Sequence, residues 1–217
     1  MLTPNHQTPL LMSDKSCADK SSLTDLAAQQ DPAALSFDES CKDERGKDER
    51  SKNERGKDER WMEEALRCAQ RALESGEVPV GAVIVCEGQV VGRGWNRNLT
   101  DNDPSAHAEI VALREAGRNL GNHRLGACEL FVTIEPCAMC AGAMTHARLR
   151  RLVYGADDPK AGAVHSILQV VNHARLNHRM EVQGGVLAGR AAEMLQEFFR
   201  KRRERSPGTP QLDGDSD

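Results

Sequence analysis

The segment 133–140, which reads Thr-Ile-Glu-Pro-Cys-Ala-Met-Cys, has two cysteines directly after a proline that interrupts an apolar run. Proline is favoured at the first position of a helix, where its missing N–H would have no partner. Residues three apart are neighbours on a helix, so Cys137 and Cys140 are expected on one face. A helix amino terminus favours negative charge, and the thiolate is the form of cysteine that binds metal ions. The segment therefore predicts a strand, a sharp turn and a helix that begins with two metal ligands.

Besides two cysteines, a catalytic zinc site needs a third protein ligand and a group that carries protons. His107 and Glu109 are the candidates for these two roles. Three protein ligands, here His107, Cys137 and Cys140, leave the fourth tetrahedral position of a zinc ion open to water, as catalytic zinc requires. Zinc lowers the pKa of that water, and a carboxylate beside the ion can carry protons between water and substrate. Glu109 is the candidate for that role. The pattern His-x-Glu followed by Pro-Cys-x-x-Cys is typical of zinc-dependent nucleobase deaminases.

Two simpler interpretations explain less of the sequence. Cys137 and Cys140 could be half of a structural zinc site, but that site needs a second His or Cys pair at metal-binding spacing, and the sequence offers none. Glu109 could be an acidic residue of a first helical turn that only favours the helix dipole. The combined pattern is more specific than either of its parts, so a catalytic zinc site is the prediction.

Alternating strand-like and helical patterns begin near Trp61 and end near Arg205. Before them, residues 42–60 repeat Lys-Asp-Glu-Arg or Lys-Asn-Glu-Arg every five residues without an apolar position, so we expect a solvated, disordered or transiently helical segment. The predicted organisation is a charged, disordered extension over 1–60, one zinc-dependent domain over 61–205 and a disordered tail over 206–217.

Charge and cysteine content limit the setting in which the chain works. The net charge of −4 comes from acidic residues in the terminal segments, so it says little about the central region. The sequence has no secretory signal pattern and no run of about 18 apolar residues, so neither secretion nor a membrane span is expected. A cytoplasmic setting keeps the seven cysteines reduced, and there a close cysteine pair favours a metal over a disulfide.

The central region predicts a mixed sheet with helices on both faces. A helix from near Trp61 to Gly76 precedes a hairpin whose turn signal is Glu87-Gly88. Later strands alternate with helices, which favours parallel neighbours. The remaining expected elements are strands at 80–85, 90–95, 129–134, 152–154 and 179–182, helices at 107–116 and 137–147, a short helical piece at 166–171 and a last helix with its apolar face between 191 and 199. The predicted fold class is α/β, a three-layer α/β/α sandwich with a mixed central sheet.

With these motifs the chain resembles the bacterial tRNA-specific adenosine deaminases, which convert the wobble adenosine of an arginine tRNA to inosine. The resemblance covers about Trp61 to Arg205. It is carried by the segments 77–83 (Glu-Val-Pro-Val-Gly-Ala-Val), 94–97 (Gly-Trp-Asn-Arg), 106–110 (Ala-His-Ala-Glu-Ile), 135–144 (Glu-Pro-Cys-Ala-Met-Cys-Ala-Gly-Ala-Met), 177–179 (Asn-His-Arg) and 198–200 (Phe-Phe-Arg). It implies a cytidine-deaminase-like fold and a hydrolase that works as a cytoplasmic homodimer on tRNA, with one zinc ion per subunit.

The resemblance also implies roles for particular residues. It makes His107, Cys137 and Cys140 the zinc ligands and Glu109 the residue that moves protons. The family works on an adenosine that is flipped out of the anticodon loop, where the bases are already unpaired and extrusion is cheap.

Two more residues gain a role from the resemblance alone. Asn96 is implied to contact the flipped nucleoside, and Asp158 to lie near its ribose and backbone. Without the resemblance, Asn96 could equally cap a loop and Asp158 could equally be a turn residue before Pro159. The segment 200–203 is either a solvated helix end or a phosphate-contacting patch, and recognition of a splayed single strand over a basic surface favours the patch.

Two other functions use the same residues. A deaminase of free guanine, cytosine or a nucleotide would turn over the free base and form no inosine in tRNA. A zinc-stabilised RNA-binding module without activity would keep its RNA function after Glu109→Gln.

Overall fold

The computed structural model describes the backbone of residues 43–205 and the side chains of residues 54–204. The disorder predicted for 1–42 and 206–217 lies outside the described residues. In chain order the elements are α1 Asp43–Glu74, β1 Gly81–Cys86, β2 Gln89–Trp95, α2 Asn98–Asp101, α3 Ala108–Leu120, β3 Cys128–Ile134, α4 Ala138–Ala147, β4 Arg151–Ala156, β5 Glu181–Gln183 and α5 Ala188–Arg205.

The strands form one mixed sheet in the order β2-β1-β3-β4-β5. β1 pairs antiparallel with β2 and β3, whereas β3, β4 and β5 are parallel to one another. The hairpin turn between β1 and β2 consists of Glu87 and Gly88, both with positive φ (49° and 76°), which matches the twist of a two-residue hairpin. The predicted hairpin followed by parallel strands is confirmed.

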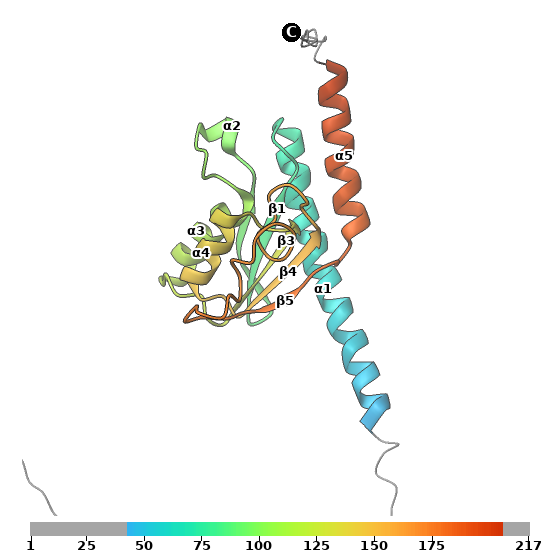
Figure 1. Cartoon of the computed structure of the whole chain (residues 1–217), viewed down its shortest axis with the longest axis vertical. Coiled ribbons are helices and arrows are strands. Elements are labelled where there is room, and N and C mark those ends of the chain that lie inside the picture. The colour runs from blue at the N-terminus through green and yellow to red at the C-terminus, as the bar shows by residue number, and fades with distance from the viewer. Residues whose placement is uncertain (1–42, 206–217) are drawn as a thin grey trace, which may run out of the picture. The chain divides into compact units, whose positions relative to one another are not determined.

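Alternation along the strands divides the core into two layers, one on each face of the sheet. One set of side chains packs against α3 and α4, and the other packs against α1. Figure 1 shows α3 and α4 on one side of the sheet and α1 and α5 on the other. The first set includes Ala82, Ile84, Leu130, Val132 and Leu152, and the second includes Val83, Val85, Phe131 and Val153. This is the predicted three-layer sandwich.

α1 begins at Asp43, whereas the sequence pattern predicted a helix start near Trp61. The last charged repeat is docked on the sheet: Asp58 is 4% exposed and accepts two hydrogen bonds of 2.7 Å from Arg151 in β4. Arg151 also donates to Glu129 in β3 at 3.2 Å. Charge-assisted, bidentate bonds of this kind compensate the loss of hydration of the buried groups. Through Asp58, a polar turn of α1 is therefore bound to β4, and the sequence of the helix alone does not indicate this contact.

One local prediction was wrong: residues 166–171 form turns and irregular structure instead of a helical piece. The amides of Ile167 and Leu168 donate to the carbonyl of Gly162, and the amide of Val170 donates to that of Ala163, instead of to the residue four positions earlier as in an α-helix. The one-turn helix α2 has no counterpart among the predicted elements.

Gly94 in β2 lets α3 approach the sheet closely. A Cβ at this position would lie 2.0 Å from the carbonyl oxygen of Ala108 and 2.6 Å from the amide nitrogen of Ala112, both in α3. Because α3 begins directly after His107, this contact sets the distance between the sheet and the first turn of α3.

Gly94→Ala should lower the free energy of unfolding by about 3 kcal/mol, the upper part of the usual cost of overpacking, because the atoms that must move belong to the backbone. Urea-induced unfolding measures the change. Gly117→Ala in α3 is the control, since its Cβ would lie 3.5 Å from the carbonyl oxygen of Asn122, an ordinary contact. The control should keep its stability or gain up to about 1 kcal/mol from higher helix propensity. Equal stability of the two variants would contradict the close approach.

Candidate metal centre and substrate cleft

Three side chains with metal-binding atoms meet where α3 and α4 begin. His107 is the N-cap residue of α3, Cys137 is the N-cap residue of α4, and Cys140 lies in the first turn of α4. Nδ1 of His107 lies 3.6 Å from Sγ of Cys137 and 3.6 Å from Sγ of Cys140. The structure thus brings together all three residues that the sequence spacing selected as ligands.

The distances in this cluster fit a tetrahedral zinc ion. Bond lengths of about 2.3 Å to sulfur and about 2.05 Å to nitrogen put these two ligand atoms about 3.6 Å apart at a tetrahedral angle. Among the described residues, no fourth His, Cys, Asp or Glu side chain belongs to this cluster, whose ligand atoms lie within 4.8 Å of one another. One imidazole and two sulfurs with a fourth corner open are the donor set of a catalytic zinc site.

The two sulfurs differ in their titration because they lie side by side. Hydrogen bonds from Cys140 and from His107 hold the pKa of the Cys137 thiol at about 3. The neighbouring Cys137 sulfur, together with burial, raises the pKa of Cys140. Two adjacent sulfurs without a cation share one negative charge, so a bound cation is the partner that would stabilise both thiolates.

Glu109 lies in the first turn of α3, two residues after His107, and its side chain lines the cleft next to the cluster. It is 3% exposed, and burial raises the pKa of its carboxyl group. A buried carboxyl group with a raised pKa in a cleft is suited to take up and release a proton.

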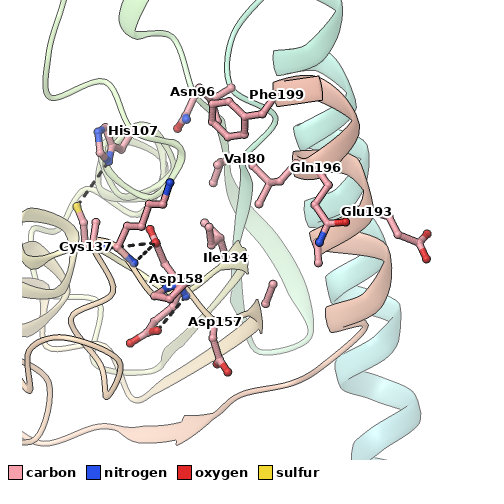
Figure 2. A pocket seen from close by; sticks show the side chains of 18 of the residues that line it. Val80, Asn96, His107, Ile134, Cys137, Asp157, Asp158, Glu193, Gln196 and Phe199 are labelled. Atoms are coloured by element: carbon pink, nitrogen blue, oxygen red, sulfur yellow. Dashed lines mark hydrogen bonds between the residues drawn. The ribbon is translucent and has the colours of Figure 1, made fainter. Parts of the chain in front are cut away.

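A cleft of about 1200 Å³ opens in front of these residues. Val80 and Ile134, at the ends of the first and third strands, contribute apolar side chains to it, and Asn96 contributes an amide. Figure 2 shows His107 and Cys137 facing this space, with Phe199 and Gln196 of α5 across from them. A cleft that combines apolar side chains with many polar and charged groups is suited to a flat, polar ligand such as a nucleobase.

Asn96 is 8% exposed, and the structure fixes how its side chain is turned. Its Oδ1 accepts a hydrogen bond of 2.9 Å from the amide of Ala108, the first residue of α3. No acceptor in the described part of the chain pairs with its Nδ2. Asn96 therefore caps the first turn of α3 instead of a loop, and its Nδ2 is left for a ligand in the cleft that Asn96 lines.

Asp158 lines the cleft, and one of its oxygens belongs to a turn. Its Oδ1 accepts hydrogen bonds from the amides of Lys160 at 2.9 Å and Ala161 at 3.2 Å. The sequence left open whether Asp158 is a turn residue or a binding residue, and these two hydrogen bonds correspond to the turn residue. Oδ2 of Asp158 takes part in no hydrogen bond among the described residues.

Two buried carboxylates near the cleft were not assigned a role from the sequence. Glu77 accepts hydrogen bonds from the amide (2.7 Å) and hydroxyl (2.9 Å) of Thr100 in α2. Burial by itself would raise the pKa of Glu135, but hydrogen bonds from Ser166 and from three backbone amides lower it to about 2. A charged residue that directly follows the buried strand β3 was the available signal for Glu135.

α5 also contributes to the cleft, which the sequence pattern did not indicate. Gln196, Phe199, Arg200 and Arg203 line it, and Phe199 is 41% exposed. The apolar pattern of this helix predicted only that it packs against the core. The basic residues at its end therefore lie beside the candidate metal centre, which could not be inferred from helical periodicity.

Comparison with known proteins agrees with this geometry. The family model described as MafB19-like deaminase matches residues 56–203. A tRNA-specific adenosine deaminase of Haemophilus influenzae is 48% identical over 144 residues, which cover 66% of this chain and 83% of that protein. None of the helices between residues 43 and 205 is long and apolar enough to span a bilayer.

Solved structures lead to the same group of proteins. A structure from work on A-to-I editing by tRNA:A34 deaminases has a TM-score of 0.61 and 46% identity, covering 63% of this chain and 99% of that chain. Guanine deaminase from Nitrosomonas europaea is more distant, with a TM-score of 0.55 and 27% identity, covering 64% of this chain and 83% of that chain. The chain belongs to the deaminase family that the matching model describes and, within the relatives compared, to the tRNA-specific adenosine deaminases.

Proposed function

We propose that the protein hydrolyses the adenosine at wobble position 34 of a tRNA anticodon to inosine and ammonia. The observation that carries this proposal is the cluster of His107, Cys137 and Cys140 beside the buried Glu109, at the bottom of a cleft with room for a nucleotide. Its close relatives are tRNA-specific adenosine deaminases, and an arginine tRNA is the substrate we propose.

His107, Cys137 and Cys140 would hold one zinc ion in each subunit. When bound, the zinc ion supplies a water molecule of lowered pKa as the nucleophile near neutral pH. Glu109 takes a proton from the attacking water and delivers it to the ring nitrogen next to the reacting carbon. Glu109 then takes the proton of the hydroxyl group newly bonded to that carbon and passes it to the exocyclic amine, which leaves as ammonia while the carbonyl group of inosine forms.

The cleft orients the base for this reaction. Asn96 offers its Nδ2–H to an acceptor on the nucleoside, because its Oδ1 is already bonded to α3. Val80 and Ile134 provide apolar contact to the base. Asp158 lies in the loop that borders the cleft and is proposed to face the ribose and backbone of the extruded nucleotide.

The basic end of α5 supports tRNA as the partner. Arg200, Arg203 and Lys160 line the cleft, whose lining also includes Asp157, Asp158, Glu193 and Glu197. These three cations are the candidates for contact with phosphate groups. Phe199 is an exposed aromatic ring on the same wall, available for stacking with an unpaired base. We also propose a cytoplasmic location, since tRNA is found there.

A homodimer is supported by apolar side chains on the surface beside the site. Met139, Ile167 and Leu168 are 39%, 57% and 49% exposed. They lie on adjoining segments, because Cys137 pairs with Gly162, whose carbonyl accepts from the amides of Ile167 and Leu168. Exposed apolar groups of this kind are common at subunit interfaces.

The alternative of a free-nucleobase deaminase is favoured by one observation, the structural similarity to a guanine deaminase at 27% identity. The tRNA reading is supported by higher identity to tRNA deaminases and by the basic residues along the cleft.

Purified protein should form inosine in an anticodon stem-loop and leave free guanine and cytosine unchanged, as followed by mass spectrometry. Glu109→Gln should reduce turnover by about 10²–10⁴-fold, the usual contribution of a general acid–base group. Its zinc content and melting temperature should stay close to those of the wild type. Turnover of a free base without inosine in the RNA would overturn the choice of substrate.

Cys137→Ala should differ from Glu109→Gln in its metal content: it should lose bound zinc as well as activity. A Glu109→Gln protein that still forms inosine would refute the role of Glu109 in proton transfer. A wild type that binds the stem-loop and forms no inosine would leave an RNA-binding module.

Light scattering should give a mass of twice the 23.8 kDa chain for the homodimer. Introducing a charge with Leu168→Glu should shift the mass toward that of a single chain. A wild-type mass of one chain at micromolar concentration would refute the dimer.

Replacing both Arg200 and Arg203 by Gln should raise KM for the stem-loop and weaken its salt dependence. Each lost phosphate contact with single-stranded RNA reduces the slope of log K against log salt by about 0.7. Arg202→Gln is the matched control, since Arg202 lies on the same turn of α5 but does not line the cleft. An unchanged slope in the double variant would show that the two arginines do not contact phosphate.

A further inference from the structure

Glu135 is a buried carboxylate that the proposed chemistry does not use. It directly follows β3 and is 1% exposed. A carboxylate without contact to water is stable only when hydrogen bonds replace its hydration.

In the described part of the chain, every hydrogen-bond donor to Glu135 comes from one segment, residues 157–166, which we name the cleft loop. Oε1 accepts from the amides of Val164 (3.0 Å), His165 (2.8 Å) and Ser166 (3.0 Å). Oε2 accepts from the amide of Asp158 (3.1 Å) and from the hydroxyl of Ser166. A single side chain thus holds both ends of the loop.

The cleft loop encloses this carboxylate without spare room. A Cβ at Gly162 would lie 2.3 Å from Oε2 of Glu135 and 2.6 Å from the carbonyl oxygen of Asp158. The amide of Ala163 also donates to the carbonyl of Pro136 at 2.8 Å, so the loop is attached to the chain immediately before Cys137.

The cleft loop also forms part of the wall of the substrate cleft. Residues 157–161 line the cleft, and so does Glu135 itself. The position of these residues relative to the metal ligands therefore depends on the hydrogen bonds that Glu135 accepts. Figure 2 shows Asp157 and Asp158 of this loop below His107 and Cys137.

We propose that Glu135 is a positioning residue, which acts on substrate binding by holding the cleft loop in its binding-competent arrangement. This inference rests on the proposed function. If the loop is ordered for only part of the time, the apparent affinity falls by that fraction, whereas chemistry in the bound state is unchanged. The effect should therefore appear in KM and not in kcat.

Glu135→Gln tests this role because it removes one acceptor while keeping the size of the side chain. The carbonyl oxygen of the new side chain can still face the amides of Val164, His165 and Ser166. Its NH2 group then faces the N–H of Asp158 and cannot accept a hydrogen bond from it. KM for the anticodon stem-loop should rise about tenfold, as expected from one unpaired buried donor, with kcat changed by less than about threefold. Bound zinc should stay at the wild-type level. Amide hydrogen exchange of the 157–166 peptide should become faster.

Glu129→Gln is the matched control, a 5% exposed glutamate at the other end of β3 whose partners include Arg150 and Arg151. It should lower the melting temperature and leave KM and the exchange of the cleft loop unchanged. If Glu135→Gln does not fold, Ser166→Ala removes only the hydroxyl donor and should raise KM by a smaller factor, with faster exchange of the loop.

Unchanged exchange of the cleft loop, a lower kcat at constant KM, or loss of zinc in Glu135→Gln would overturn the proposal. Failure of the wild type to form inosine would refute the proposed function instead, and the exchange measurement would still decide whether Glu135 holds the loop.

Discussion

The contact between one imidazole nitrogen and two sulfurs, made where α3 and α4 begin, is the interaction on which the proposed chemistry depends. β2, β1 and β3 are adjacent in the sheet, so the helices that cover them are neighbours and their first turns can meet. Gly94 allows α3 to lie close enough to the strands for His107 to reach Cys137 and Cys140. Both helix amino termini favour negative charge on the sulfurs, so the backbone and the side chains act in the same direction.

Three buried glutamates around the cleft show how the surroundings of a carboxyl group decide its task. Glu77 and Glu135 accept hydrogen bonds from the loops beside them, and the donors keep the charge of Glu135 stable while its carboxylate keeps the cleft loop in place. Burial instead raises the pKa of Glu109, which makes this carboxyl group suited to proton transfer. The same residue type can therefore act as a structural anchor or take the proposed acid–base role, according to the hydrogen-bond donors around it.

The wall opposite the metal centre depends on the outer helical layer. α5 contributes Phe199 and Arg203 to the cleft, and it is held by packing of Ala191 against Leu66 of α1 and Ala156 of β4. α1 and the surface that would meet RNA are thus connected through an apolar contact. A substitution that loosens this contact would change the cleft without touching a residue of the metal centre.

The sequence by itself determined the order of the strands along the chain and selected the candidate ligands His107, Cys137 and Cys140, which the structure brings together. Apolar runs and the spacing around Pro136 are local patterns, so they can be read without knowing which segments meet. Only the tertiary structure decided where α1 starts, how the amide of Asn96 is turned and what Glu135 binds. The docking of the α1 turn before Trp61 involves the pair Asp58 and Arg151, which are 93 positions apart, and such a pair leaves no periodic trace in the sequence. Hydrogen bonds between distant residues exist only after the sheet has brought their segments together, and this is why these features could not be predicted.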